Sequence, residues 1–277
     1  METATLTVAL ISDVFFGPDG PARLRARLAE AKALGAELAV LPEIPLDPWA
    51  PATDIARDED AEPPDGPRQQ AMSAAAREVG IGLVGGAILR DPGSGARRNT
   101  AHVYDARGHL LARYAKLHLP EEPGFWETAH YVPGSEPPRV VDAFPLAVGV
   151  QICSDINRPE GSHLLGAQGA EVITAPRATE LRTYERWKLV FQANALTSCA
   201  YVLSVNRPAP ELGVLLGGPS VAVGPDGRIL LETTDPIGVV RLDRAVIQEA
   251  RLAYPGYLPV RARLYAEAWG EIARRDG

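Results

Sequence analysis

Three side chains that together could perform nucleophilic catalysis stand directly after short apolar segments. These segments end at residues 42, 115 and 152, and the residues that follow them are Glu43, Lys116 and Cys153. Catalytic groups in α/β proteins commonly gather at the ends of strands. A carboxylate can take the proton of a thiol, a thiolate is a strong nucleophile, and an ammonium group stabilises an oxyanion. These residues therefore form a complete set for attack on an acyl carbon.

Each of the three residues, taken alone, also has a structural explanation. A cysteine at the end of a strand is more often a small buried hydrophobic residue than a nucleophile. A lysine or a glutamate is usually a solvated surface residue. The elements that position these residues, and the sequence around them, therefore decide the interpretation.

The hydrophobic pattern predicts strands that alternate with helices. Predicted helices cover residues 21–34, 69–79, 159–169 and 184–198, and β-type runs lie between and around them. Hairpins are predicted around residues 106–108 and 224–227, followed by a strand at 238–242 and a short helix at 244–251. The proline-rich, acidic stretch 45–67 is predicted to be a long loop of the kind that often walls an active site.

This order of elements predicts an α/β fold with four layers. Each half of the chain alternates helices with strands and contains one hairpin, so we expect two mixed sheets packed face to face with helices outside, an α-β-β-α sandwich. The chain has 277 residues, a length that suits one α/β domain, and we expect residues 1–277 to form a single domain.

The three reactive residues lie within ordered motifs that extend over nearly the whole chain. The motifs are Leu41-Pro42-Glu43, residues 114–120 continuing through 123–127 to 131–134, residues 149–155 with Pro159-Glu160, and later 194–195, 204–207, 218–220 and 224–227. Together these segments resemble the nitrilase superfamily of carbon–nitrogen hydrolases. Three such motifs in the same order are far more specific than any one of them.

The resemblance implies a role for each matching residue. Glu43 would be the general base, Lys116 the stabiliser of the tetrahedral intermediate, and Cys153 the nucleophile that forms a thioester. Glu127 matches a second glutamate that positions substrate in amidase-like members. The backbone N–H of Ser154 would be an oxyanion donor.

Departures from the patterns of subfamilies narrow the expected substrate. True nitrilases resemble one another in a Cys-Trp-Glu stretch, whereas this chain has Cys153-Ser154-Asp155, which favours an amide over a nitrile. Residues 123–127 are similar to N-carbamoylputrescine amidases. Ile156 and Asn157 stand where D-amino-acid carbamoylases carry two arginines. We therefore expect hydrolysis of a small linear amide or N-carbamoyl compound with release of ammonia; a nitrilase or a non-catalytic scaffold with this fold are the alternatives.

Five further residues are candidates for contact with the substrate. Arg158 and Arg177 could bind a carboxylate through their guanidinium groups, although Arg177 also stands where a structural ion pair is common. Trp49, Phe125 and Trp126 could line an apolar pocket, with core or dimer packing as the equal alternative. His118, two residues after Lys116, is expected to form a structural hydrogen bond instead of a Cys–His dyad.

Composition limits the partners of the protein. A net charge of −7 argues against binding of nucleic acid or an anionic membrane, and no apolar segment reaches the length of about 20 residues that spans a bilayer. The first residues lack the basic region of a signal peptide, and two cysteines form no disulfide framework, so we expect a cytoplasmic protein. The histidines lack metal-ligand spacing, and no metal or organic cofactor is expected. The family resemblance implies a homodimer or higher homo-oligomer, with a C-terminal extension from about residue 255 in dimer contacts.

Overall fold

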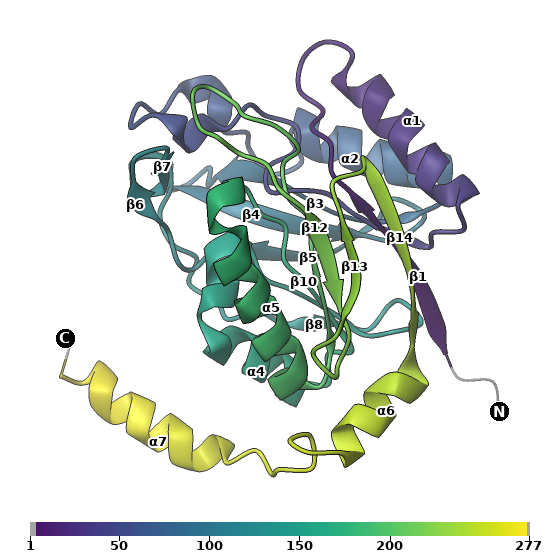
Figure 1. The fold of residues 1–277 in the computed structure, drawn as a ribbon. Helices are drawn as coiled ribbons and strands as arrows, with labels where there is room; N and C mark the ends of the chain where they lie inside the picture. The colour runs from purple at the N-terminus through teal and green to yellow at the C-terminus, as the bar shows by residue number, and fades with distance from the viewer. Residues whose placement is uncertain (1–3, 276–277) are drawn as a thin grey trace.

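Two six-stranded sheets pack face to face in the computed structural model, which describes residues 4–275 (Figure 1). The three strands β1, β2 and β3 run parallel, and the other pairs of the first sheet are antiparallel. This sheet is therefore mixed, as predicted. In spatial order its strands are β14 (Ile237–Asp243), β1 (Thr5–Ile11), β2 (Leu38–Val40), β3 (Gly82–Arg90), β4 (Arg97–Tyr104) and β5 (Leu110–Ala115).

The second sheet is also mixed. Its central strands β9, β10 and β11 run parallel, and the flanking pairs are antiparallel. The two predicted hairpins are confirmed as β4–β5 and β12–β13, whereas the strand predicted at 238–242 is β14, which returns to the first sheet and pairs with β1. In spatial order the strands are β13 (Ile229–Thr233), β12 (Ser220–Val223), β11 (Tyr201–Ser204), β10 (Val172–Thr174), β9 (Val148–Val150) and β8 (Val140–Val141).

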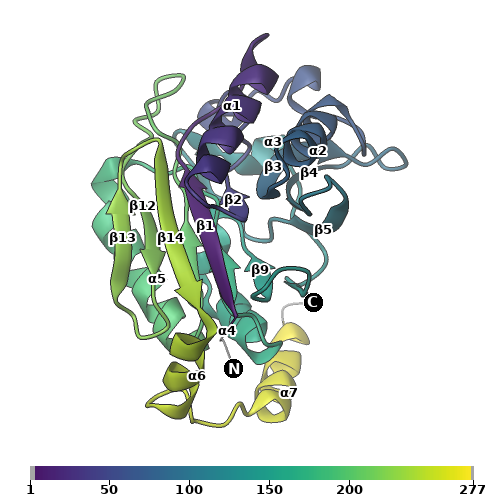
Figure 2. The same ribbon diagram turned by 90° about the vertical axis from the view of Figure 1, so that its right-hand side faces the viewer.

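Helices cover the outer face of each sheet, which completes the four predicted layers (Figure 2). The helix α2 begins with a proline at its first turn and ends at Gly80, whose positive φ of 70° forms the C-terminal cap. The first sheet is covered by α1 (Gly20–Ala33) and α2 (Pro67–Val79), and the second by α4 (Pro159–Ala167) and α5 (Tyr184–Ser198).

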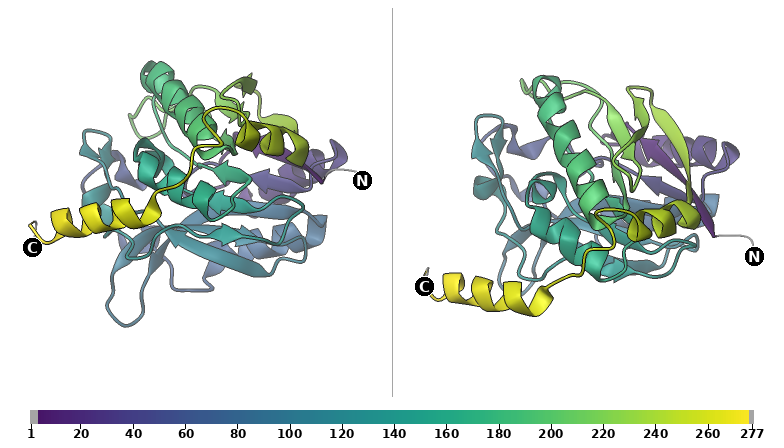
Figure 3. Two further views of the ribbon diagram at one scale, coloured as in Figure 1. Left: turned by 90° about the horizontal axis from the view of Figure 1, so that it is seen from below. Right: turned by 60° about the horizontal axis from the view of Figure 1, so that its bottom comes forward.

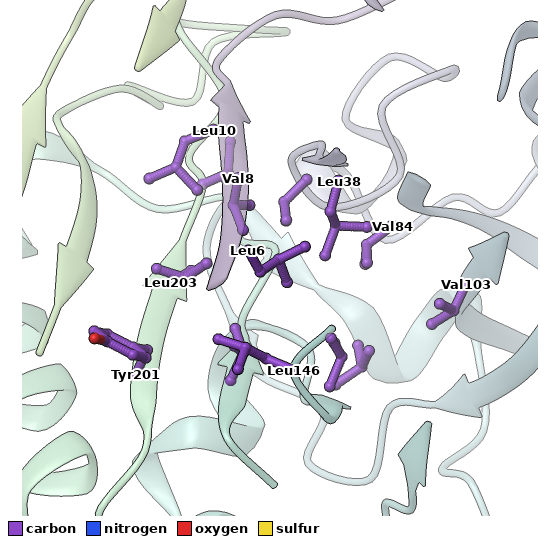
Figure 4. Close-up of a cluster of buried hydrophobic side chains, with 14 of the residues drawn as sticks. Leu6, Val8, Leu10, Leu38, Val84, Val103, Leu146, Tyr201 and Leu203 are labelled. Carbon is purple, nitrogen blue, oxygen red and sulfur yellow. The ribbon is translucent and has the colours of Figure 1, made fainter. Parts of the chain in front are cut away.

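The main hydrophobic core lies between the two sheets (Figure 4). Side chains alternate along each strand, so Val8 and Leu10 of β1 face Leu203 of the second sheet, while Ala9 and Ile11 face the layer of α1 and α2. Burial of a large aliphatic side chain stabilises the fold by about 1.5–3 kcal/mol. Because both faces of the sheets are covered, strands such as β3 are buried along most of their length instead of alternating between core and solvent.

The loop between β2 and α2 is long, as predicted, and it contains two short 3₁₀ turns, η1 (Ala50–Ala52) and η2 (Asp58–Asp60). A small two-stranded sheet and a short helix follow β5 on the same side of the molecule (Figure 1). These elements surround the ends of the strands that carry the reactive residues. They are β6 (Glu121–Glu122), β7 (Phe125–Trp126) and α3 (Glu127–His130).

The C-terminal segment leaves the sandwich as an extended arm. The predicted helix after β14 is α6 (Arg244–Leu252), and a further helix, α7 (Ala262–Ala273), was not predicted. Figure 3 shows α7 projecting beyond α4, and no residue of α7 is buried. Among the helices within residues 4–275, none is long and apolar enough to cross a membrane.

Candidate active site

The fold brings the predicted glutamate and lysine into direct contact. Glu43 follows β2 and Lys116 follows β5, and the Nζ atom of Lys116 lies 2.7 Å from Oε1 of Glu43. Both side chains are fully buried. Residues 73 positions apart in the sequence therefore meet because their strands belong to one sheet.

Glu127 is the second carboxylate on the same ammonium group. It begins the short helix α3, and its two oxygens lie 2.6 and 2.8 Å from Nζ of Lys116. Burial alone would lower the pKa of Lys116, but the carboxylates of Glu127 and Glu43 raise it, so the lysine is a cation. Burial raises the pKa of Glu127, with a further contribution from Glu43 and an opposing one from Lys116. One fixed positive charge therefore stands between two carboxyl groups.

Cys153 lies at the first position of the 3₁₀ turn η3 (Cys153–Asn157), three residues after β9. Its φ of 47° is a left-handed conformation, which non-glycine residues adopt rarely and mostly at functional sites. Its backbone N–H donates to the carbonyl of Pro176 over 2.8 Å, which holds the turn against the strand end. Burial raises the pKa of Cys153, Glu43 and Glu127 raise it further, and Lys116 opposes them. The resting side chain is therefore a thiol that needs a base.

Ala178 connects the cysteine to the glutamate. Its backbone N–H donates to Oε2 of Glu43 over 3.1 Å, and its carbonyl lies 3.9 Å from Sγ of Cys153. A small cavity of about 10 Å³ is bounded by Glu43 and by Ile152, the residue before the cysteine. The thiol and the carboxylate therefore contact the same backbone segment.

Two residues that the sequence interpretation did not assign hold Glu43 in place. Asn99 of β4 donates its amide to Oε1 of Glu43 over 2.7 Å. Arg207, fully buried, donates to the backbone carbonyls of Glu43 and Ile44 over 2.9 Å each. Asn99 carries no sequence signal beyond a polar residue within a buried strand, whereas Arg207 lies inside one of the later matching segments, 204–207.

Asp155 is a third unassigned residue, and it joins the cysteine turn to the lysine segment. Its side chain accepts the backbone N–H groups of Leu117 and His118, over 3.1 and 2.9 Å. The ring of His118 also forms a hydrogen bond with Asp155, with 2.8 Å between Nδ1 and Oδ1. This contact is the structural hydrogen bond that the sequence predicted for His118. The signal available in the sequence was the position of Asp155 within the cysteine motif.

Comparisons with known proteins show the family of the chain. The model of the carbon-nitrogen hydrolase family matches residues 19–252, which is most of the chain. The chain belongs to the carbon-nitrogen hydrolase family. A hydrolase of this family acts on non-peptide carbon–nitrogen bonds, and the buried set of Glu43, Lys116, Glu127 and Cys153 lies within the matched region.

Among relatives, this carbon–nitrogen hydrolase is 29% identical over 257 residues to an omega-amidase from Homo sapiens, covering 90% of this chain and 91% of the relative. It is 30% identical over 247 residues to a nitrilase homologue from Dictyostelium discoideum, covering 85% of this chain and 74% of the relative. In both comparisons the similarity extends over most of this chain and most of the relative. Relatives named omega-amidase and N-carbamoylputrescine amidase place this chain in the amidase-like branch of the nitrilase superfamily.

Solved structures confirm the four-layer fold of this carbon–nitrogen hydrolase. Saccharomyces cerevisiae Nit3, a member of branch 10 of the nitrilase superfamily, superposes with a TM-score of 0.79 at 27% identity, covering 94% of this chain and 97% of that one. A carbon-nitrogen hydrolase from Helicobacter pylori G27 superposes with a TM-score of 0.84 at 20% identity, covering 96% and 98%. The second similarity concerns the fold alone.

The aromatic residues predicted for the pocket lie in the wall beside the candidate catalytic residues. Trp49 is fully buried, donates its indole N–H to the carbonyl of Gly124 over 2.8 Å, and meets the ring of Phe125 edge-on at 5.8 Å. Trp126 is half-buried on β7, directly before Glu127. Trp49 therefore packs as a core residue of the surrounding wall, whereas Phe125 and Trp126 retain partly exposed surface.

The remaining predicted residues lie outside the hydrogen-bonded set of Lys116 and its carboxylates. Arg158 is exposed at the start of α4. Arg177 is fully buried, its guanidinium donates to Thr179 and to the carbonyl of Pro219, and burial lowers its pKa to about 10. Ser154 follows the cysteine and donates its hydroxyl to the carbonyl of His118. Within residues 4–275, no group of three or more His, Cys, Asp or Glu residues is arranged to hold a metal ion.

Proposed function

We propose that this carbon–nitrogen hydrolase cleaves a small linear amide through a thioester on Cys153 and releases ammonia. The observation that carries the proposal is the buried ammonium of Lys116 between Glu43 and Glu127, with Ala178 in contact with both Glu43 and the thiol of Cys153. A base, a positive charge and a nucleophile, the groups that acyl transfer requires, are therefore connected through one set of buried contacts.

In the proposed first half-reaction, Glu43 takes the proton of Cys153 as sulfur attacks the carbonyl carbon. The resulting oxyanion is stabilised by the ammonium of Lys116 and by the backbone N–H of Ser154. The carbon–nitrogen bond then breaks, and the proton held by Glu43 passes to the leaving nitrogen. Ammonia leaves and the acyl group stays on sulfur as a thioester.

In the second half-reaction, water replaces ammonia. Glu43 takes a proton from the water as its oxygen attacks the thioester carbon, and Lys116 again stabilises the oxyanion. The carbon–sulfur bond breaks, the sulfur recovers the proton from Glu43, and the carboxylic acid leaves. Because Glu127 binds Lys116 through both oxygens, we assign it to orienting the ammonium and the substrate amide.

The burial of the reactive side chains supports a small substrate. Cys153 is 4% exposed, and the side chains of Glu43 and Lys116 are fully buried. Relatives named omega-amidase and N-carbamoylputrescine amidase are each similar over 70% or more of this chain, which favours a linear amide or N-carbamoyl compound. Contact of Arg158 or Arg177 with a substrate carboxylate stays a prediction.

The test is ammonia release by the wild-type protein and Cys153→Ala. The panel contains primary amides, N-carbamoyl amines and amino acids, and nitriles matched to the amides in their carbon chain. We expect Cys153-dependent release from amides or N-carbamoyl compounds that exceeds release from the matched nitrile. Preference for the nitrile would make the protein a nitrilase, and no Cys153-dependent release from any group would favour a non-catalytic scaffold.

We also propose that the protein is a cytoplasmic homodimer held partly by its C-terminal arm. An isolated helix of 12 residues is marginal in water, yet α7 exposes Leu264, Tyr265, Trp269 and Ile272 by 45–64% each. A second copy of the chain would cover these side chains. Light scattering should give a dimer mass for the wild type and a monomer for Tyr265→Glu/Trp269→Glu; a monomeric wild type would contradict the proposal.

A further inference from the structure

A second and much larger cavity lies at the edge of the sandwich, where β5 and β8 are the last strands of their sheets. Its volume is about 620 Å³, within the range of about 300–1,000 Å³ typical of small-molecule sites. Glu43, Lys116, Glu127 and Cys153 do not line it. None of these four side chains would therefore contact a ligand in this cavity, although Ala101 lines both cavities.

The floor of this edge cavity is apolar and comes from both sheets. Ala101 and Val103 of β4 and Tyr114 of β5 line it from the first sheet, and Val141 and Val150 line it from the second. All five belong to the buried cluster between the sheets. These five side chains are each at most 9% exposed, and the partly exposed Leu89 and Ala112 line the cavity beside them. The apolar gain on binding comes mainly from burial of the ligand's own methylene groups.

The rim of the edge cavity is rich in arginine. Four arginines line it against two acidic residues, Asp91 and Glu136. Two of the arginines are already paired with carboxylates, Arg90 with Asp58 and Arg113 with Asp65. The other two arginines are matched in number by Asp91 and Glu136, so what distinguishes them is the absence of a hydrogen-bonded partner and not an excess of charge.

The other two arginines are Arg98 and Arg139. In the part of the chain that the structure describes, neither guanidinium donates a hydrogen bond or forms an ion pair. Asp91, the acidic residue near Arg98, is instead hydrogen-bonded to Ser94 over 2.6 Å. Both arginines therefore line the cavity with N–H donors that are unpaired within residues 4–275, although the charge of Arg98 also acts on Asp91. The planar donor fork of a guanidinium group matches the two oxygens of a carboxylate.

We infer that the edge cavity binds a small amphipathic carboxylate. Its aliphatic or aromatic body lies on the floor of Ala101, Val103 and Val150, and its carboxylate accepts hydrogen bonds from Arg98 and Arg139. A neutral molecule of the same shape would gain only the apolar contact. This site does not depend on the proposed reaction, because no catalytic residue takes part in it.

The experiment is calorimetric titration of the full-length protein with octanoate and with 1-octanol as the neutral analogue. We expect octanoate to bind one site per chain and Arg98→Gln/Arg139→Gln to weaken that binding by about tenfold or more, since two charge-assisted contacts are lost. Arg241→Gln is the matched control, because Arg241 is exposed on β14 and outside the cavity. It should leave the affinity unchanged.

A second variant fills the floor and leaves the arginines intact. Ala112→Trp places an indole in the cavity from the edge strand β5 and should abolish octanoate binding. The inference is overturned if octanoate does not bind, if octanol binds equally well, or if the double arginine variant keeps the wild-type affinity. In that last case octanoate occupies another site, such as the catalytic one.

Discussion

The hydroxyl of Tyr114 donates a hydrogen bond to Oδ2 of Asp155 over 2.8 Å and thereby joins β5 to the turn that carries Cys153. The other oxygen of Asp155 accepts the backbone N–H of Leu117, the residue after Lys116. One buried carboxylate thus fixes the lysine segment relative to Cys153. The proposed reaction would depend on this spacing, because small displacements of catalytic groups are costly.

Asp155→Asn should therefore lower kcat by about ten- to a hundredfold, because an amide has only one acceptor oxygen for donors that now use two. Tyr114→Phe removes one of those donors and should have a smaller effect in the same direction. Steady-state kinetics with the substrate found in the panel provides the measurement. Tyr104→Phe is the control, since that hydroxyl donates to Gln69 on the outer face of the first sheet; equal kinetics in all three variants would refute the positioning role.

Glu43→Gln should make the thiol of Cys153 more acidic and at the same time lower amide turnover. Burial and then Glu43 raise the pKa of Cys153, so removal of the Glu43 charge should lower that pKa. The pH midpoint for alkylation of Cys153 by iodoacetamide should move down, while amide turnover falls by roughly 10²–10⁴-fold because the base is lost. Glu160→Gln, at an exposed position on α4, should change neither quantity. An unchanged or higher alkylation midpoint would show that Glu43 does not act on the thiol.

Asp47 should make stability depend on pH in the weakly acidic range. Burial raises its pKa to about 6, against the opposing effect of Arg68. Because the native pKa lies above the unfolded value of about 3.9, the native state binds the proton more tightly. The free energy of unfolding contributed by Asp47 should therefore fall by up to about 3 kcal/mol as the pH rises from about 4 to 6, and stay level above that.

Urea unfolding of the wild type and Asp47→Asn at pH 4.5 and pH 7 measures this contribution as a difference. All other titrating groups are common to both proteins. The wild type should lose more stability than Asp47→Asn between the two pH values. The same change in both proteins would show that Asp47 titrates alike in the folded and unfolded states.

Much of the fold followed from local patterns. The helices α1, α2, α4 and α5 and both hairpins were predicted because their apolar spacing, prolines and glycines act within one element. The return of β14 to β1 was not predicted, because strand pairing across more than 200 residues leaves no local signal. The helix α7 was missed because its apolar side chains face no other part of the described chain.

The residues of the candidate site likewise fall into those with a local sequence signal and those whose contacts form only on folding. Glu43, Lys116 and Cys153 were found because each ends an apolar strand segment and lies in a motif. Asn99 was missed because its role rests on a hydrogen bond to Glu43, 56 positions away in the sequence. That contact forms only when the chain folds and leaves no local pattern. Arg177 was a candidate for substrate contact, with a structural role as the alternative, because a guanidinium group suits a carboxylate. Its burial and its hydrogen bonds to Thr179 and Pro219 could not be predicted, because they depend on tertiary packing.

The proposed reaction depends on a thioester between Cys153 and the substrate acyl group, and capture of this intermediate by hydroxylamine during turnover can detect it. Hydroxylamine competes with water for an acyl-enzyme, so part of the product should be the hydroxamic acid of the substrate acyl group. We expect the wild-type protein to form hydroxamic acid at the expense of free carboxylic acid, and we expect Cys153→Ala to form no hydroxamic acid. Release of free acid alone by the wild type, or turnover by Cys153→Ala at the wild-type rate, would contradict it.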